Sequence, residues 1–122
     1  KEIVRATIEA VAYQTYDLFE AMKHDGLRPK IVKVDGGMVM NNWFSQFLSD
    51  VVNVKVLRPK VQETTAAGAA FMAGLKIGVY KSLKDISKNW HLDKKFSPKM
   101  KNNFRNVLIQ GWSTAIKRTL IN

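Results

Sequence analysis

The chain has 122 residues, of which 46% are hydrophobic and 25% are charged, and its formal net charge is +10. This balance is typical of a folded globular domain rather than a disordered segment. No apolar run approaches the roughly 20 residues that a membrane-crossing helix needs, so we expect a cytoplasmic protein with no membrane partner. Cysteine is absent, and His24 and His91 lie far apart in the sequence. The sequence therefore predicts no disulfide and no metal site built from side chains alone.

The positive charge raises the question of a nucleic-acid partner, because basic domains often bind nucleic acids or anionic membranes. Lys and Arg are spread over most of the chain, and those in the C-terminal third recur at the spacing of solvent-facing helix positions. A nucleic-acid-binding module would also need aromatic side chains exposed among the basic ones, whereas the aromatic residues here fall on apolar helix faces. We interpret the charge as a solvated basic surface and expect no nucleic-acid partner.

The chain opens with a predicted helix and a predicted strand. Apolar or small residues recur every three or four positions over residues 4–22, which predicts an amphipathic helix. Asp25-Gly26 gives this helix a C-terminal stop, and Arg28-Pro29 forces an extended chain after it. Residues 31–34 then predict a short strand, apolar enough to be buried on both faces as in a parallel sheet.

Residues 31–42 read IVKVDGGMVMNN and form the most informative local feature. The apolar strand stops at Asp35, turns through Gly36-Gly37 and reaches two asparagines at the start of an amphipathic stretch. Two adjacent glycines permit positive φ and let a flat ligand approach the backbone with no Cβ in the way. The pattern predicts a strand, a tight loop and a helix, at the sheet edge where open α/β folds usually bind nucleotides.

The next elements continue the α/β pattern. Apolar residues after the loop recur at helical spacing and predict a helix with a buried face; they are Trp43, Phe44, Phe47, Leu48 and Val51. Residues 54–57 predict a second strand that Arg58-Pro59 ends. Strand, helix and strand in this order predict a right-handed parallel crossover.

The run VQETTAAGAAFMAGLKIG predicts a third helix, which Thr64 or Thr65 caps and Gly78 ends. Its small residues leave a smooth, wide face, for which we expect tight packing against a sheet or a neighbouring helix of the same chain. Residues 81–88 predict a short surface helix, and residues 89–96 show no clear period.

Ser97-Pro98 predicts the start of the last helix, as an N-cap followed by a first-turn proline. Its apolar side is formed by Phe104, Val107, Leu108, Trp112, Ala115, Ile116 and Leu120. Only two strands are predicted in all, and a two-stranded sheet is seldom stable alone. We therefore expect residues 1–122 to form a single α/β domain with an incomplete sheet, which is a piece of something larger or is completed by a partner.

Two segments carry a resemblance to a known family. VDGGMVMNNWFSQFLSD and VLRPKVQETTAAGAAFMAGLKIGVY closely resemble the C-terminal part of the FGGY carbohydrate kinases, and within them the glycerol kinases. The likeness is continuous from about Glu2 to Gly78 and looser to the end. It implies the C-terminal part of an actin-like, ribonuclease H-like ATPase domain, with parallel strands and crossover helices. It also implies ATP-dependent phosphorylation of glycerol to glycerol 3-phosphate, with Mg²⁺ accompanying the nucleotide.

The resemblance assigns two nucleotide-binding residues. Gly37 matches the family glycine whose backbone lies against the nucleotide, and Asn41 matches the asparagine whose amide reaches the adenine end. From the residues alone, a turn glycine and a helix-capping asparagine remain the alternatives. Gly36 is expected to serve the turn, and Asp35 to end the strand or hold the loop by hydrogen bonds.

The groups that perform the chemistry are expected elsewhere. In this family the base for the attacking hydroxyl, the phosphate loops, the metal ligands and the glycerol pocket belong to upstream segments, so no catalytic residue and no metal ligand is assigned in this chain. We expect these 122 residues alone to lack kinase activity, and the full-length enzyme to bind ATP or ADP and glycerol and to form a homo-oligomer. The alternatives are another FGGY sugar kinase, or a truncated remnant that acts as a basic binding or interaction module.

Overall fold

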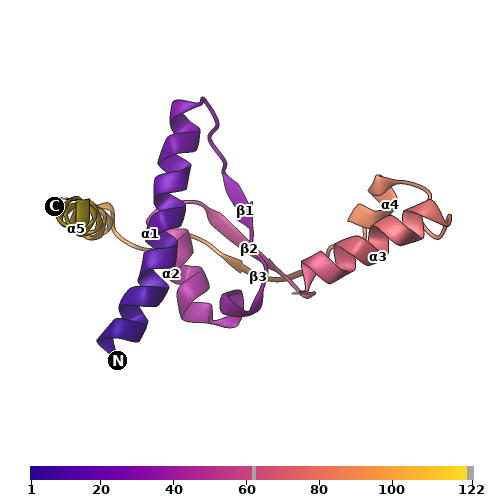
Figure 1. Ribbon diagram of the computed structural model, residues 1–122, viewed down its shortest axis with the longest axis horizontal. Coiled ribbons are helices and arrows are strands. Elements are labelled where there is room, and N and C mark those ends of the chain that lie inside the picture. The colour runs from indigo at the N-terminus through magenta and orange to yellow at the C-terminus, as the bar shows by residue number, and fades with distance from the viewer. Residues whose placement is uncertain (62, 121–122) are drawn as a thin grey trace.

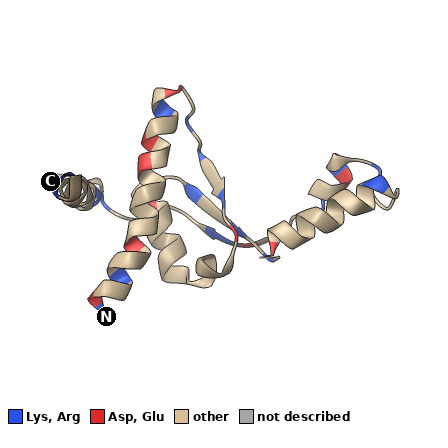
Figure 2. Cartoon of the chain, viewed as in Figure 1, with Lys and Arg blue, Asp and Glu red and all other residues tan. Residues whose placement is uncertain are grey.

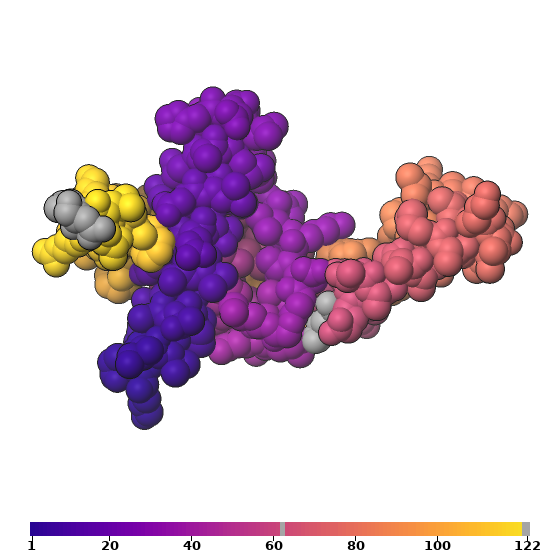
Figure 3. Space-filling model, in the orientation of Figure 1, coloured from indigo at the N-terminus to yellow at the C-terminus, as the bar shows by residue number. Residues whose placement is uncertain are grey.

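The computed structural model describes residues 1–61 and 63–120, and its elements are arranged as Figure 1 shows. In chain order they are α1 (Glu2–His24), β1 (Ile31–Lys33), the 3₁₀ helix η1 (Gly37–Met40), α2 (Asn42–Val52), β2 (Lys55–Pro59), α3 (Thr64–Lys76), α4 (Leu83–Ser87), β3 (Leu92–Phe96) and α5 (Asn102–Leu120). Helices α1 and α2 lie beside the sheet, α5 lies on their far side, and α3 and α4 extend away from the sheet as an arm (Figures 1 and 3). The predicted α/β class is confirmed.

The sheet has three strands in the order β1-β2-β3. Strands β1 and β2 run parallel with Val32 opposite Val56, so the predicted parallel crossover through α2 is present. Strand β3 pairs antiparallel with β2, with Val56 opposite Phe96. The expectation of only two strands was wrong, because the LDKKF segment of β3 has no apolar alternation and forms a strand through pairing with β2.

Strand β2 continues through Arg58 and Pro59, where the sequence predicted that it would end. Pairing with β3 extends the strand, and the ladder is irregular between these two residues. Proline has no N–H to contribute to a ladder, and the next backbone N–H, that of Lys60, donates to the carbonyl of His91 at 2.9 Å. The partner strand therefore carries β2 past a residue type that usually stops one.

Only one face of the sheet is covered by the described elements. Helix α2 packs on β2 and β3, so Val56 is fully buried. On the opposite face Ile31 is 52% exposed, and its cross-strand neighbour Lys55 is exposed as well. The prediction that the first strand is buried on both faces was wrong for this chain, because β1 lies at the sheet edge and no described element covers its outer face.

The core forms where α2 lies between α1 and the sheet. Its buried apolar residues are Ala12, Tyr13, Phe19, Val39, Phe44, Phe47, Leu48, Val51, Val52, Val56 and Phe96. The predicted apolar face of α2 is therefore confirmed, with one exception. Trp43 is 44% exposed and stacks on Phe47 with a centroid separation of 5.1 Å. The guanidinium of Arg5 lies 5.6 Å from the Trp43 ring centroid.

Helix α3 occupies the predicted residues, but its start and its packing differ from prediction. Glu63 is the N-cap and makes no side-chain cap bond, so neither Thr64 nor Thr65 caps the helix. Most of its small residues, such as Ala66 and Ala70, are exposed, because the helix points away from the sheet and core of the described chain (Figure 3). The expected close packing is therefore absent within residues 1–61 and 63–120.

The ends of the remaining helices follow local hydrogen bonding. Gly78 has φ +82°, and the following N–H of Val79 donates to the Gly74 carbonyl at 2.8 Å, so the predicted glycine stop is confirmed. Ser82 caps the short surface helix α4, as its hydroxyl accepts from the N–H of Asp85. The predicted surface helix within residues 81–88 is thus present.

The last helix begins at Asn102 and not at Ser97-Pro98. The Oδ1 atom of Asp50, on α2, accepts from the backbone N–H groups of Lys99 at 2.5 Å and Met100 at 3.1 Å. These bonds hold residues before α5 against α2 in a non-helical path. The predicted apolar side of α5 is largely exposed, with Phe104 58% and Val107 66% accessible, while Leu108 and Trp112 pack against the core.

Charged residues are distributed and not gathered. Figure 2 shows Lys and Arg on α1, on the strands and on the α3–α4 arm, interspersed with Asp and Glu. This distribution agrees with the interpretation of a solvated basic surface. No helix within the described residues is both long enough and apolar enough to span a bilayer.

The buried hydroxyl of Tyr13 makes the core lose stability at alkaline pH. The Tyr13 ring stacks on that of Trp112 with a centroid separation of 5.4 Å. Burial, with the nearby charge of Glu9, raises the pKa of the Tyr13 hydroxyl to about 12. An unfolded tyrosine titrates near 10, so this stabilisation is complete below about pH 10 and is lost as pH rises toward about 12. We expect the unfolding free energy of Tyr13→Phe, measured by urea unfolding, to fall less between about pH 10 and about pH 12 than that of the unsubstituted chain. Equal slopes in both proteins would contradict this assignment.

Candidate functional site

The turn that follows β1 is the candidate site. It comprises residues 35–42, which connect the end of β1 to the first residue of α2 through η1. Strands β1 and β2 are parallel, so the turn lies beyond the carboxyl end of a parallel strand, where open α/β sheets place their ligand sites. The strand, loop and helix predicted from the IVKVDGGMVMNN pattern are confirmed, with η1 as an additional element inside the loop.

The two glycines of the turn have different roles. Gly36 has φ +87°, a conformation that other residues rarely adopt, and this confirms that it serves the turn. Gly37 has no positive φ and is exposed, and a Cβ built on it would meet no atom within 4 Å. The chain itself therefore leaves the surface above Gly37 open, so that a ligand can lie against the backbone there.

Asn41 is the N-cap of α2. Its Oδ1 atom accepts from the backbone N–H of Trp43 at 3.0 Å and of Phe44 at 3.3 Å, which confirms the capping interpretation. The cap uses the oxygen of the amide. The exposed Asn41 side chain keeps the Nδ2 group for a donor role. Capping and ligand contact are thus compatible because they use different atoms.

Arg58, on β2, supports the turn from the side of the sheet. It is only 6% exposed, and its Nη1 donates to the carbonyl oxygens of Val39 at 2.8 Å and Met40 at 3.2 Å and to Asn42 Oδ1 at 3.2 Å. Its Nε donates to Asp93 Oδ2, on β3, at 2.7 Å. The buried guanidinium is therefore neutralised by Asp93 and bonded to the turn through Nη1 and to the neighbouring strand through Nε.

Two further contacts hold the turn, one in its middle at Val39 and one at its first residue, Asp35. The hydroxyl of Ser45, which is fully buried, donates to the Val39 carbonyl at 2.8 Å. The hydroxyl of Thr64, the first residue of α3, donates to the carboxylate of Asp35. The prediction that Asp35 holds the loop by hydrogen bonds is confirmed, and its partner comes from the base of the α3–α4 arm.

The sequence reasoning missed these supports. Arg58 was interpreted as a strand end, although Val54, Val56 and Arg58 alternate and so lie on one face of the strand. An arginine that continues an inward apolar alternation is a signal for a buried, paired guanidinium. Ser45 and Thr64 carried no such signal, since each is an ordinary polar residue at the start of a helix.

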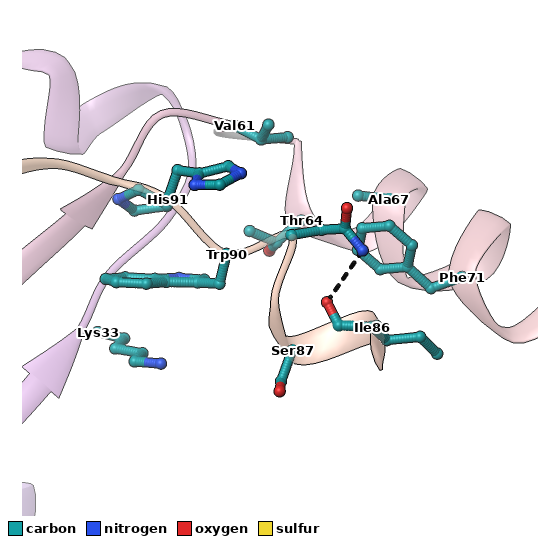
Figure 4. Close-up of a pocket in the computed structure, with 11 residues that line it drawn as sticks. Lys33, Val61, Thr64, Ala67, Phe71, Ile86, Ser87, Trp90 and His91 are labelled. Carbon is teal, nitrogen blue, oxygen red and sulfur yellow. Dashed lines mark hydrogen bonds between the residues drawn. The ribbon is translucent and has the colours of Figure 1, made fainter. Parts of the chain in front are cut away.

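A separate pocket of about 300 Å³ lies between the strand ends and the α3–α4 arm. Figure 4 shows Trp90 and Lys33 on one side of it and Phe71 and Ile86 on the other. The Lys33 ammonium lies 4.0 Å from the Trp90 ring centroid. Gly37 and Asn41 do not line this pocket, so it is distinct from the proposed nucleotide contacts. Among the described residues, no three His, Asp or Glu side chains gather into a possible metal site.

The turn, Arg58 and α3 all fall within a region shared with a known family. The C-terminal domain of the FGGY family of carbohydrate kinases matches residues 1–77. The chain belongs to this family. The resemblance stated from the sequence is thereby confirmed, and the FGGY match covers every residue of the turn and each contact of its supports except Asp93.

Curated relatives and solved structures agree with this assignment. The chain is 52% identical to glycerol kinase 1 of Pseudomonas aeruginosa over 118 residues, covering 97% of the chain and 24% of that protein. It is 50% identical to glycerol kinase of Gluconobacter oxydans, covering 97% of the chain and 23% of that protein. The chain thus spans about a quarter of the length of these FGGY relatives.

The structural likeness includes a nucleotide-bound protein. The structure of Plasmodium falciparum glycerol kinase with ADP matches with a TM-score of 0.81 at 36% identity, over 98% of this chain and 24% of that one. A xylulose kinase from Lactobacillus acidophilus matches with a TM-score of 0.75 over 98% of this chain and 24% of that one, at 23% identity, which bears on the fold alone. These matches confirm the predicted fold of this FGGY chain, the C-terminal part of an actin-like, ribonuclease H-like domain.

Proposed function

We propose that the chain is the nucleotide-binding C-terminal part of a glycerol kinase, and that residues 1–122 form a single unit that is the C-terminal part of that enzyme's nucleotide-binding domain. The proposal rests on the 50 to 52% identity to two glycerol kinases and on the likeness to a glycerol kinase solved with ADP. The observation that carries it is the turn at residues 35–42, which leaves Gly37 open and, among the described residues, leaves Nδ2 of Asn41 as a donor with no bond. The enzyme would be cytoplasmic and homo-oligomeric.

Gly37 and Asn41 would hold the nucleotide. The exposed Gly37 lets the ligand lie against the backbone, because any side chain there would fill the open surface. The Nδ2 group of Asn41 would donate to a ring nitrogen of the adenine, while Oδ1 stays committed to the α2 cap. The cap thus fixes the orientation of the amide before the nucleotide arrives.

ATP would supply the γ-phosphoryl group that is transferred to a hydroxyl of glycerol. Mg²⁺ would be held through the phosphates and by residues outside this chain. This chain would orient and bind the nucleotide. The base and the glycerol pocket would come from the rest of the enzyme, so the chain alone would have no kinase activity.

The experiment is a chimaera in which this chain replaces the matched 118-residue segment of Pseudomonas aeruginosa glycerol kinase 1. We expect ATP-dependent phosphorylation of glycerol by the chimaera and none by the 122-residue chain alone. A chimaera that folds, as judged by circular dichroism, yet does not phosphorylate glycerol would overturn the proposed function.

Substitution of Asn41 tests the donor within the chimaera. Asn41→Asp and Asn41→Ser both keep an oxygen that can cap α2 and both remove the Nδ2 donor. We expect each to raise the KM for ATP by about tenfold, the loss of one hydrogen bond, and to leave the thermal midpoint almost unchanged. The matched control is Asn53→Asp at the other end of α2, which should not change the KM for ATP. An unchanged KM in both Asn41 variants would refute the contact.

A further inference from the structure

Arg58 lies where it can set the geometry of the proposed nucleotide site without touching the nucleotide. It is 6% exposed, and its side chain extends from β2 to the turn at residues 35–42. Its Nη1 contacts Met40 O and Asn42 Oδ1, the residues on either side of Asn41, each at 3.2 Å. One guanidinium therefore contacts both neighbours of the capping asparagine, Met40 through its backbone carbonyl and Asn42 through its side chain.

The same side chain links the turn to β3. Its Nε donates to Asp93 Oδ2 at 2.7 Å, and the guanidinium lies 5.6 Å from the Phe96 ring centroid. A planar guanidinium can donate in several fixed directions at once, which a lysine ammonium on its flexible stem cannot reproduce. The contacts with Asp93 and Phe96 of β3 thus fix the orientation of the guanidinium whose other donors bond the turn.

The Val39 carbonyl shows how tightly this arrangement is specified. It accepts from Arg58 Nη1 at 2.8 Å and from Ser45 Oγ at 2.8 Å, so the carbonyl points inward and is fully used. With the carbonyls of Val39 and Met40 bonded to Arg58, Gly37 and Asn41 stay exposed on the outer surface of the turn, beside the half-exposed side chains of Met38 and Met40. Arg58 thus fixes the backbone directly next to Asn41.

We infer that Arg58 is a positioning residue, held by Asp93, which keeps residues 39–42 of the turn in the conformation that binds the nucleotide. The expected effect on ATP binding rests on the proposed function. The expected effect on the conformation of the turn rests on the hydrogen bonds of Arg58 alone. Loss of Arg58 should weaken nucleotide binding through the turn, while the glycerol site, which lies outside this chain, is unaffected.

The first test follows the turn itself, by hydrogen exchange of the 122-residue chain. Arg58→Met removes the donors and keeps an unbranched apolar stem. We expect exchange in residues 38–42 to become about tenfold faster or more, with the interior of α2 much less affected. Val56→Ala, a fully buried residue of the same strand, is the control for general destabilisation. Equal acceleration of the turn in both variants, or none in Arg58→Met, would overturn the inference.

The second test is kinetic and uses the chimaera. Arg58→Met and Arg58→Lys should each raise the KM for ATP by about tenfold or more, because small displacements of positioning groups are costly, and leave the KM for glycerol within about twofold. Val56→Ala should lower the thermal midpoint without this selective rise. A loss confined to kcat would overturn the inference. Failure of the unsubstituted chimaera would instead count against the proposed function, and hydrogen exchange would still decide the role of Arg58.

Discussion

Replacing Asp50 with alanine is expected to lower the free energy of unfolding by about 3 kcal/mol, since three part-buried hydrogen bonds to one carboxylate are lost and each contributes about 1 kcal/mol or more. Asp50 is 8% exposed, and its Oδ1 accepts from Lys99 N, Met100 N and Gln46 Nε2. Alanine leaves all three donors without this acceptor and frees the segment that leads into α5. Urea unfolding followed by circular dichroism measures the loss.

Two variants separate this tether from ordinary surface contacts. Asp50→Asn keeps one acceptor oxygen in place and should cost about 1 kcal/mol, in the range of a single hydrogen bond. Asp17→Ala removes another link to α5, the exposed bond from Trp112 Nε1 to Asp17 Oδ2, and should cost less than about 1 kcal/mol. If Asp50→Ala unfolds within about 0.5 kcal/mol of the parent chain, the range of ordinary surface substitutions, the tether has no energetic role.

Replacing Gly37 with valine is expected to weaken ATP binding by about a hundredfold, or roughly 2.7 kcal/mol, as a rise in the KM of the chimaera. The reason is steric: the open surface above Gly37 would be filled by the new side chain, while the backbone there has no positive φ to be strained. Gly37→Ala, with a single methyl, should produce a smaller rise of about tenfold. The thermal midpoint should change little in either variant.

Two other glycines serve as references for this effect. A methyl group added to Gly111, within α5, would also meet open space, and Gly111→Ala should stabilise the helix slightly without changing the KM for ATP. Gly36→Ala should lower the stability of the chain because of its φ of +87°. An unchanged KM for ATP in Gly37→Val would remove Gly37 from the nucleotide site.

The sequence predicted those parts of the fold that local pattern determines. The period of α1, the apolar strands on either side of α2 and the stop at Gly78 are each encoded within a few residues of their position. Strand β3 was not predictable in this way, because its pairing partner β2 makes it a strand and its own residues do not. The start of α5 could not be predicted for a similar reason. Asp50, far away in the sequence, accepts the hydrogen bonds of the two N–H groups that follow Pro98.

The candidate site was predicted in outline but not in its supports. The asparagine at position 41 admitted two interpretations, and the structure shows that its oxygen caps α2 while its contact with a nucleotide stays a prediction. The local pattern at Arg58-Pro59 predicts only a strand end. The role of Arg58 depends on the parallel register of β1 and β2 and on Asp93 from β3, which no short sequence window contains.

The α3–α4 arm has a topological consequence for how this chain can vary. Strands β2 and β3 are antiparallel neighbours, and Lys60 N donates to His91 O where the arm leaves and rejoins the sheet. The whole arm is therefore an elaborated hairpin connection whose two ends meet. Such a connection can lengthen or shorten beyond Thr64 without shifting a single strand pairing. Evolutionary change there need not disturb the turn that Arg58 supports and that Thr64 joins at Asp35.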